Sequence, residues 1–283
     1  MKKFVSFLLC AVLMSAFFSI FAVPAMADDS ITVSDYYGFV DALSKVKEGG
    51  TINVINDYRL TYLYVRENID IDTPCTINFK NVYFTQNDCR DSFLEVNAND
   101  VTLNFNNCEF RTKDGRATIC NERGSAIHVD GKNCIINGNG STLFWDCCTN
   151  ALYGGAIYID DGYSGCRIDG CEFRSCCAAM AGGAIYSSAD DCVISNCVFD
   201  DCMVGDRTFF VYGEENSQTR LVNCTDGDGN PCYEYNCPGC VFVNTSGFTL
   251  SDGNWWIIAA GGVVILGGLA AIVIVNKKKK SAV

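Results

Sequence analysis

The sequence predicts an all-β fold in which the chain winds into a solenoid of stacked parallel coils. The pattern Cys-x-Ile-x-x-Cys-x-Phe-x-x-Cys spans residues 166–176 and returns 26 residues later at 192–202. Each copy holds short β-branched or aromatic runs with two-residue alternation, which is typical of strands. Gly, Asn and Asp interrupt the runs, as turns require. A period in the twenties is typical of repeats that bury apolar side chains only against their neighbours.

Weaker copies extend the repeat in both directions. The window 75–84 shifts by 26 residues onto 101–110, and residues 50–54 have the composition of an opening strand. About seven coils therefore fit between residues 50 and 225. A coil of this length holds two or three short strands, so stacking gives parallel sheets with rungs about 4.8 Å apart. The fold class predicted is a right-handed parallel β-helix.

Two short motifs give the repeat a resemblance to a known family. Gly-Gly-Ala-Ile occurs at 154–157 and 182–185, and Phe-Thr-Gln-Asn occurs at 84–87. This pair is similar to the GGAI and FxxN motifs repeated in the polymorphic outer-membrane protein family, within the wider pectate-lyase-like β-helix superfamily. The resemblance implies a right-handed parallel β-helix and an amphipathic N-terminal capping helix at 39–43. It implies no single activity, because this scaffold carries lyases, hydrolases, adhesins and inert stalks. Cysteine replaces the closing Asn in three copies, at Cys147, Cys176 and Cys202.

The two ends predict a secreted protein anchored in a bacterial cell membrane. Residues 1–27 have the charged start, apolar stretch and small-residue cleavage site of a signal peptide. Residues 255–275 carry no charge and are long enough to span a bilayer once. Lysines in the 276–283 tail would hold the C-terminus in the cytoplasm, with the β-helix outside. This anchor departs from the polymorphic family, whose members end in an outer-membrane barrel. The expected organisation is a signal peptide at 1–27, an N-terminal cap with a short helix at 28–49, the β-helix at 50–225, a Cys-rich cap and juxtamembrane linker at 226–254, the transmembrane helix at 255–275 and a basic tail at 276–283.

The expected extracellular part is strongly acidic. The chain has 21 Lys and Arg and 33 Asp and Glu, and six of the lysines lie in the two terminal segments. Residues 28–254 therefore carry 15 basic against 33 acidic side chains, a net charge of −18. Such a surface repels nucleic acids and anionic glycans. Neutral carbohydrate, a cationic surface protein and calcium remain as partners.

The cysteines admit two interpretations. Eighteen remain after signal cleavage, and an extracellular domain with many cysteines is usually a disulfide framework. The repeat instead places most of them in inward columns, where thiols can act as small hydrophobic groups. We favour buried thiols, with disulfides between rungs as the alternative, and we expect a disulfide knot at the C-terminal end. The columns are Cys134, Cys166 and Cys192; Cys108, Cys171, Cys197 and Cys224; and Cys147, Cys176 and Cys202; the knot would join Cys232, Cys237 and Cys240.

One outward row is the candidate binding surface. In Gly-Ala-Ile-Tyr-Ile the isoleucines alternate inward, so the tyrosine should face outward. Small residues beside a ladder of rings would form a shallow groove, suited to the apolar faces of sugars or to an extended polypeptide. The alternative is that the rings stack only to stabilise the sheet. The expected outward row is Glu95, His128, Tyr158, Tyr186 and Tyr212, and the expected outward column beside it is Phe93, Ala126, Ala156, Ala184 and Phe210.

The sequence predicts no catalytic residue, because no lyase or hydrolase active-site motif can be matched. Three acid pairs, at 160–161, 190–191 and 200–201, are interpreted as turn residues. His128 is the single histidine, and no metal site is predicted. Asp226, Asp228 and Asn230 copy the start of an EF-hand loop, but Cys237 stands where the closing Glu should be. We favour a turn there and leave weak calcium binding open.

These observations favour a membrane-anchored bacterial surface protein that binds, adheres or acts as a rigid display module, with neutral carbohydrate as one ligand class. The alternative is a cell-tethered polysaccharide lyase or glycoside hydrolase. Catalytic β-helices usually carry long loops around a cleft, whereas the linkers here are mostly short.

Overall fold

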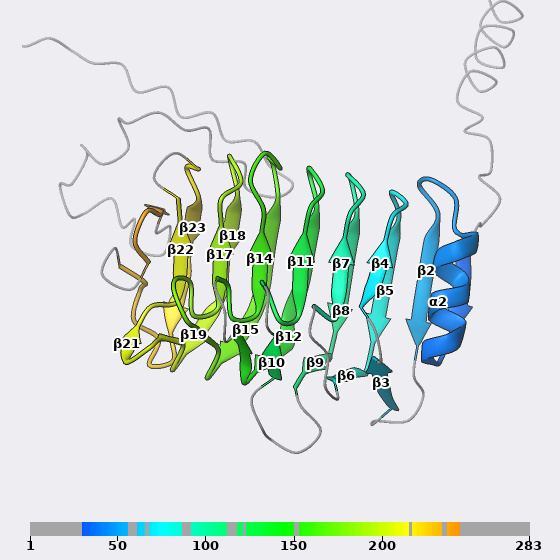
Figure 1. Ribbon diagram of the computed structural model, residues 1–283, viewed down its shortest axis with the longest axis horizontal. Helices are drawn as coiled ribbons and strands as arrows, with labels where there is room; N and C mark the ends of the chain where they lie inside the picture. Colours follow the sequence, from blue (N-terminus) through cyan, green and yellow to red (C-terminus); the bar gives the residue numbers. More distant parts are fainter. Residues whose placement is uncertain are drawn as a thin grey trace, which may run out of the picture. The chain divides into compact units, whose positions relative to one another are not determined.

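Within the described residues, the chain forms a parallel β-solenoid with one helix near its N-terminal end, after the first strand (Figure 1). The computed structural model describes residues 30–55, 61–65, 68–86, 92–111, 118–120, 123–149, 153–214, 217–233 and 237–243. The all-β solenoid prediction is confirmed. The predicted signal peptide, membrane span and basic tail lie outside the described residues. Within those residues, no helix has the length and apolar character to cross a membrane.

Three sheets form the walls of the solenoid, and all pairings are parallel except that between β20 and β21. The large sheet has the main path β1 (Ser30–Val33), β2 (Thr51–Ile55), β5 (Thr76–Lys80), β8 (Thr102–Asn106), β12 (Ile135–Trp145), β15 (Arg167–Arg174), β18 (Val193–Ser195), β23 (Arg220–Val222) and β25 (Val241–Val243). Beside this path lie β3 (Thr61–Val65), β6 (Val82–Gln86), β9 (Glu109–Phe110), β19 (Val198–Asp200) and β24 (Thr225–Asp226). The six-stranded sheet contains β4 (Ile69–Ile71), β7 (Leu94–Val96), β11 (Ile127–Val129), β14 (Ile157–Ile159), β17 (Ile185–Ser187) and β22 (Val211–Gly213). The five-stranded sheet contains β10 (Thr118–Cys120), β13 (Cys147–Thr149), β16 (Cys177–Ala178), β20 (Met203–Val204) and β21 (Arg207–Thr208).

The register follows the sequence repeat. Ile157 pairs with Ile185, and Ile185 pairs with Val211, so equivalent residues of successive coils lie one above another. Six strands in the six-stranded sheet are separated by five turns, fewer than the seven coils predicted. The predicted number is larger because it counts each copy of the repeat in the sequence as a coil, including the incomplete coils at the two ends of the solenoid.

The Gly-Gly-Ala-Ile motif forms a corner of the coil. Its first glycine has left-handed backbone, with φ of 63° at Gly154 and 65° at Gly182, where a side chain would be strained. Its second glycine leaves no space for a side chain, because a Cβ at Gly155 would lie 2.0 Å from the carbonyl oxygen of Gly183. The alanine that follows is fully buried. Each residue of the motif is therefore required by the geometry of the corner.

Stacked phenylalanine rings run through the core and begin beneath the capping helix. Helix α2 (Tyr36–Lys45) starts at Asp35, whose side chain accepts a hydrogen bond from the Gly38 N–H at 2.8 Å. Phe39 on this helix is fully buried and meets the Phe79 ring edge-on, with centroids 5.4 Å apart. This confirms the predicted cap at 39–43. Near-parallel rings then follow one another along the solenoid: Phe84, Phe110, Phe144, Phe173 and Phe199.

Left-handed residues also turn the chain ahead of the cysteine columns. Asp191, Asn196 and Asp201 have φ values of 54°, 52° and 52°, and each directly precedes a column cysteine. Asn and Asp tolerate this conformation better than other residues that carry side chains. Asp190, Asp191 and Asp201 therefore lie in turns, as the sequence predicts. Asp200 is instead the last residue of strand β19, where its carboxylate lies 3.4 Å from Arg174 Nε.

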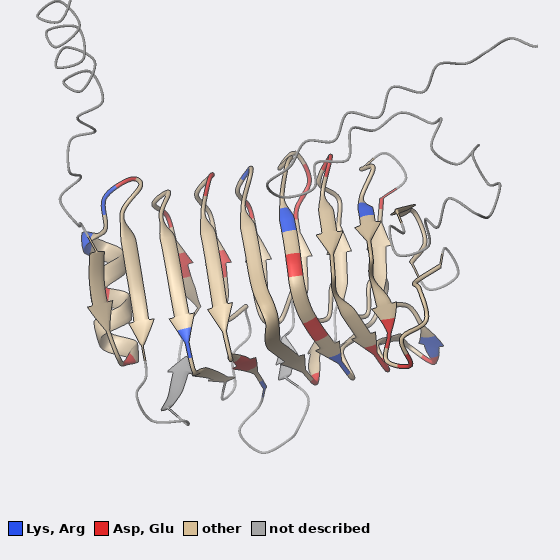
Figure 2. Cartoon of the chain, turned by 180° about the vertical axis from the view of Figure 1, so that it is seen from behind, with Lys and Arg blue, Asp and Glu red and all other residues tan. Residues whose placement is uncertain are grey.

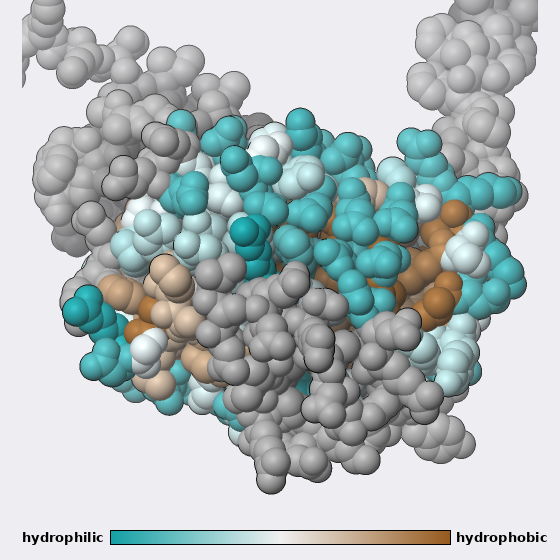
Figure 3. Space-filling model, in the orientation of Figure 1, coloured by the Kyte–Doolittle hydropathy of each residue, from teal (hydrophilic) through white to brown (hydrophobic). Residues whose placement is uncertain are grey.

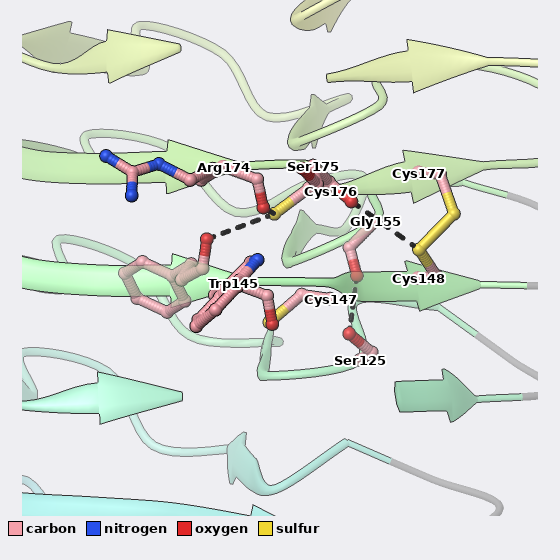
Figure 4. Close-up of a disulfide and its surroundings, with 10 residues drawn as sticks. Ser125, Trp145, Cys147, Cys148, Gly155, Arg174, Ser175, Cys176 and Cys177 are labelled. Carbon is pink, nitrogen blue, oxygen red and sulfur yellow. Dashed lines mark hydrogen bonds between the residues drawn. A yellow bond between two sulfur atoms is a disulfide. The ribbon is translucent and has the colours of Figure 1, made fainter. Parts of the chain in front are cut away.

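The cysteine columns consist of buried thiols. The described residues include 14 free cysteines, of which all but Cys240 are buried. Neighbouring thiols interact along the columns, as Cys134 does with Cys166 and as Cys176 does with its neighbours above and below. One disulfide joins two rungs elsewhere, between Cys148 on β13 and Cys177 on β16 (Figure 4). All ten column cysteines predicted from sequence are buried thiols: Cys108, Cys134, Cys147, Cys166, Cys171, Cys176, Cys192, Cys197, Cys202 and Cys224.

The predicted disulfide knot at the C-terminal end is wrong, since Cys232, Cys237 and Cys240 are all free thiols. The chain here continues the coil instead. The Gly213 N–H donates to the Pro238 carbonyl at 3.1 Å, and β25 pairs with β23. Cys232 and Cys237 are buried by this extra partial turn and do not need a cross-link to be held.

We expect a thiol count to separate buried thiols from a disulfide framework. In a variant lacking Cys89, which lies outside the described residues, and Cys120, whose side chain the structure does not describe, native protein should show about one reactive thiol, that of half-buried Cys240. Denaturation without reductant should raise the count to the 14 free cysteines of the structure, plus Cys10 where the signal peptide is retained. Ellman's reagent measures both values. A denatured count near zero would contradict the buried-thiol columns.

Candidate functional site

A row of polar and aromatic side chains runs along the six-stranded sheet. The register places Tyr158 beside Tyr186, and Glu95 beside His128, as the repeat predicts. The row also continues one strand further, to Asp70, which the sequence analysis missed. The shift of 25 residues from Asp70 to Glu95 could have revealed it. In order, the row is Asp70, Glu95, His128, Tyr158, Tyr186 and Tyr212.

The tyrosine rings of this row stack on one another. Ring centroids lie 5.2 Å apart between Tyr158 and Tyr186, and 5.4 Å apart between Tyr186 and Tyr212, with nearly parallel planes. The Tyr153 ring also packs against the Tyr186 ring, with their centroids 4.6 Å apart. Tyr158 and Tyr186 are each only 4% exposed. Their ring faces are therefore occupied within the protein, which accords with a stabilising stack, while the half-buried Tyr212 is more open.

The column predicted to lie outward beside the rings is instead part of the core. Ala156 and Ala184 are fully buried, as are Phe93 and Ala126, and Phe210 is 3% exposed. The prediction extended the two-residue alternation of the strand backwards by one residue. That alternation begins only at Ile157, because the residues before it form the glycine corner. The structure therefore provides no alanine-floored groove at these positions.

The acidic end of the row surrounds His128. Its Nδ1 lies 3.5 Å from Glu95 Oε1, and its Nε2 lies 3.2 Å from Asp130 Oδ1 and 3.9 Å from Asp160 Oδ2. Glu95 is positioned in turn by the Asn68 side-chain amide, which donates to Glu95 Oε2 at 2.7 Å. Three carboxylates from three successive coils therefore meet at one imidazole.

Arg123 fixes the Asp160 side of this cluster. Its Nη1 donates to Tyr158 Oη at 3.0 Å and lies 3.4 Å from Asp160 Oδ2. The guanidinium also lies over the Tyr158 ring, 4.9 Å from its centroid. The Tyr158 hydroxyl donates to Asp160 Oδ1 at 3.0 Å. Asp160, interpreted from sequence as a turn residue, is thus brought into the cluster, while Asp161 donates its N–H to the Asp160 carboxylate.

Burial makes these groups reluctant to carry negative charge. It is the main cause that raises the pKa of Asp70, and the nearby Glu95 carboxylate adds to it. Burial likewise raises the pKa of Asp130, against the attraction of the histidine. The pKa of Tyr158 rises to about 12, through burial first and then the charge of Asp160. The Tyr158 phenol therefore remains a hydrogen-bond donor at neutral pH.

The acidic turn at the C-terminal end closes on itself. Asp226 Oδ1 accepts from the N–H groups of Asp228 at 3.0 Å and Asn230 at 2.8 Å, and Oδ2 accepts from the Asn230 amide. These bonds, chiefly those from Asn230, lower the pKa of Asp226. The predicted turn is therefore present, and calcium binding by these residues stays a prediction.

Charged residues are distributed along the solenoid on the strands and at the turns (Figure 2). The coloured residues on the face seen in Figure 1 are largely hydrophilic, with apolar residues showing near the α2 end and near the opposite end (Figure 3). The cluster around His128 is the place where the described residues bring a histidine and several carboxylates together. Comparison of the chain with protein-family models, with curated proteins and with solved structures gave no match.

Proposed function

We propose that this chain is a bacterial cell-surface protein that binds neutral carbohydrate through the polar row of the six-stranded sheet, and that the segment 255–275 anchors it in the membrane. The observation that carries the proposal is the register of the row. Each successive strand presents one hydrogen-bonding side chain at the same position. An extended ligand lying across β4, β7 and β11 would meet Asp70, Glu95 and His128 in turn, one at each rung about 4.8 Å apart.

Because the tyrosine ring faces are occupied within the protein, the proposed recognition uses hydrogen bonds from the polar ends of exposed side chains rather than stacking of sugars on rings. Glu95 and His128 have side chains 26% and 17% exposed, so both can reach a ligand. Carboxylates are strong acceptors for hydroxyl groups, and such bonds are worth about 1.5–3 kcal/mol each. The net charge of −18 expected for residues 28–254 favours neutral over anionic sugars.

The finer family assignment belongs to the same proposal. The GGAI and FxxN motifs resemble those of the polymorphic outer-membrane proteins, and the corner formed by Gly154 and Gly155 gives the first motif a structural reason. A right-handed coil, as in the pectate-lyase-like superfamily, is also the hand that parallel crossover connections almost always take.

Binding of a neutral glycan panel by the detergent-solubilised full chain tests the proposal. Replacing both acids in Asp70→Asn/Glu95→Gln should weaken binding at least tenfold, because two charge-assisted hydrogen bonds are lost. Glu172→Gln is the matched control, since Glu172 lies on β15 of the large sheet and pairs with Arg174. The proposal would be contradicted if the wild type bound no glycan of the panel, or if Glu172→Gln weakened glycan binding as much as Asp70→Asn/Glu95→Gln does.

A polysaccharide lyase or glycoside hydrolase is the second candidate. It is favoured by the placement of two carboxylates, Asp130 and Asp160, on the same ring nitrogen of His128 beside the cationic Arg123. Pairs of carboxyl groups carry out glycoside hydrolysis in most families. Incubating the glycan panel with the protein, with and without calcium, should release reducing or unsaturated ends if this candidate is correct. Loss of that product in Asp130→Asn would assign it to the cluster.

A further inference from the structure

Two buried polar atoms in the His128 cluster face each other without a hydrogen bond. Nε2 of His128 and Oδ1 of Asp130 lie 3.2 Å apart, yet neither has a hydrogen-bond partner among the described residues. Buried polar atoms nearly always have one. Opposed unsatisfied atoms of a nitrogen base and a carboxylate are the pair that a metal cation would join.

We propose that Glu95, His128 and Asp130 bind a divalent first-row transition-metal ion. Each offers one ligand atom, and these three atoms lie within 4.8 Å of one another. Bonds of about 2.0–2.2 Å in tetrahedral geometry place ligand atoms roughly 3.3–3.6 Å apart. Each carboxylate lies at about that spacing from a ring nitrogen, Asp130 Oδ1 at 3.2 Å from Nε2 and Glu95 Oε1 at 3.5 Å from Nδ1, so side-chain rotation must bring one of them round to the nitrogen that binds the ion. Asp160, at 3.9 Å, is a further carboxylate at the same ring.

The ligand set selects the class of ion. An imidazole with carboxylates suits Mn²⁺, Fe²⁺ or Zn²⁺, whereas calcium prefers six to eight oxygen ligands. The nitrogen of His128 that does not bind the ion is left to donate its N–H, and a hydrogen bond there orients the ring and strengthens it as a ligand.

The surrounding residues hold the ligands in place before any ion arrives. Glu95 and His128 are paired residues on neighbouring strands β7 and β11, so the sheet sets their separation. Asn68 holds the Glu95 carboxylate, and Tyr158 holds Asp160. The side chains of Glu95 and Asp130 are 26% and 28% exposed, so an ion can enter from solvent.

Manganese binding by the full chain in detergent, after removal of metals with EDTA, tests this site. Mn²⁺ is the probe because it prefers carboxylate and imidazole ligands, whereas Zn²⁺ would also bind the many thiols of this chain. Electron paramagnetic resonance of free Mn²⁺ should show one ion bound per chain. His128→Gln and Asp130→Asn should each weaken binding at least about 100-fold, because each removes a ligand.

Matched variants keep the result interpretable. Asp228→Asn alters the acidic turn at the C-terminal end and should leave Mn²⁺ affinity unchanged. Glu95→Gln keeps the shape of the third ligand but removes its charge, and it should weaken Mn²⁺ binding at least tenfold. This variant tests the site again if His128→Gln fails to fold. Circular dichroism in EDTA establishes that each variant is folded. No bound Mn²⁺ in the wild type, affinity retained in all three ligand variants, or tighter binding of Ca²⁺ than of Mn²⁺ would overturn the proposal.

Discussion

Raising the pH above 9 is expected to unfold this protein steeply, because its buried thiols resist ionisation. Burial raises the pKa of Cys75 and of Cys108 from the usual 9.0 to about 11, and that of Cys192 to about 12. Between pH 9 and these values the unfolded chain releases protons that the folded chain retains. The stability due to the neutral thiols is complete below pH 9 and is lost as the pH rises through the folded-state pKa values.

The expected slope is large. Each such thiol lowers the free energy of unfolding by about 1.4 kcal/mol per pH unit, so these three lower it by about 4 kcal/mol per unit. Domains are stable by only about 5–15 kcal/mol, and unfolding should therefore follow within a few pH units. Urea unfolding followed by circular dichroism at pH 7, 9 and 10, with reductant present, measures the effect.

A cysteine variant provides the control for alkaline unfolding. Cys75→Ala/Cys108→Ala should be less stable at pH 7, yet its free energy of unfolding should fall less steeply, by about 2.7 kcal/mol per pH unit less than in the wild type. Keeping to pH 9–10 limits the contribution of Tyr158, whose raised pKa would act in the same direction at higher pH. Stability that stays constant up to pH 10 in the wild type would show that the thiols ionise freely or are absent.

The register of the coils could be predicted because the repeat marks it at every strand. Ile157 and Ile185 pair as the 28-residue shift between them requires, and the tyrosines beside them follow. The direction of Ala156 and Ala184 could not be predicted in the same way. Two-residue alternation is a property of extended backbone and fails where Gly155 and Gly183 turn the chain.

The cluster around His128 was only half visible in the sequence. Glu95 and His128 belong to the row and follow from the register. Asp130, Asp160 and Arg123 approach from outside the strands, so their meeting depends on the path of the connections, which differ in length between coils. The same connections bring Arg123 over the Tyr158 ring, and no periodicity indicates such a contact.

Alanine at Gly155 is expected to destabilise the fold by about 3 kcal/mol or more, at the upper end of overpacking costs. Its Cβ would lie 2.0 Å from the carbonyl oxygen of Gly183, 2.7 Å from that of Cys177 and 2.8 Å from that of Cys147. All three are backbone atoms, and the Gly155 N–H and carbonyl are themselves bonded to the coils on either side. No side-chain rotation can relieve the contact, so whole coils must separate.

Gly140→Ala separates this steric effect from the general cost of replacing glycine. Gly140 has φ of 65°, and a Cβ there would meet nothing within 4 Å, so the expected loss is about 1 kcal/mol from left-handed backbone alone. Gly155 lies outside the left-handed region. If backbone preference alone set the cost, Gly140→Ala would therefore lose more stability than Gly155→Ala. Urea unfolding of both variants decides between them. A Gly155→Ala protein as stable as Gly140→Ala would mean that adjacent coils can separate easily, and the close stacking on which the polar row depends would not hold.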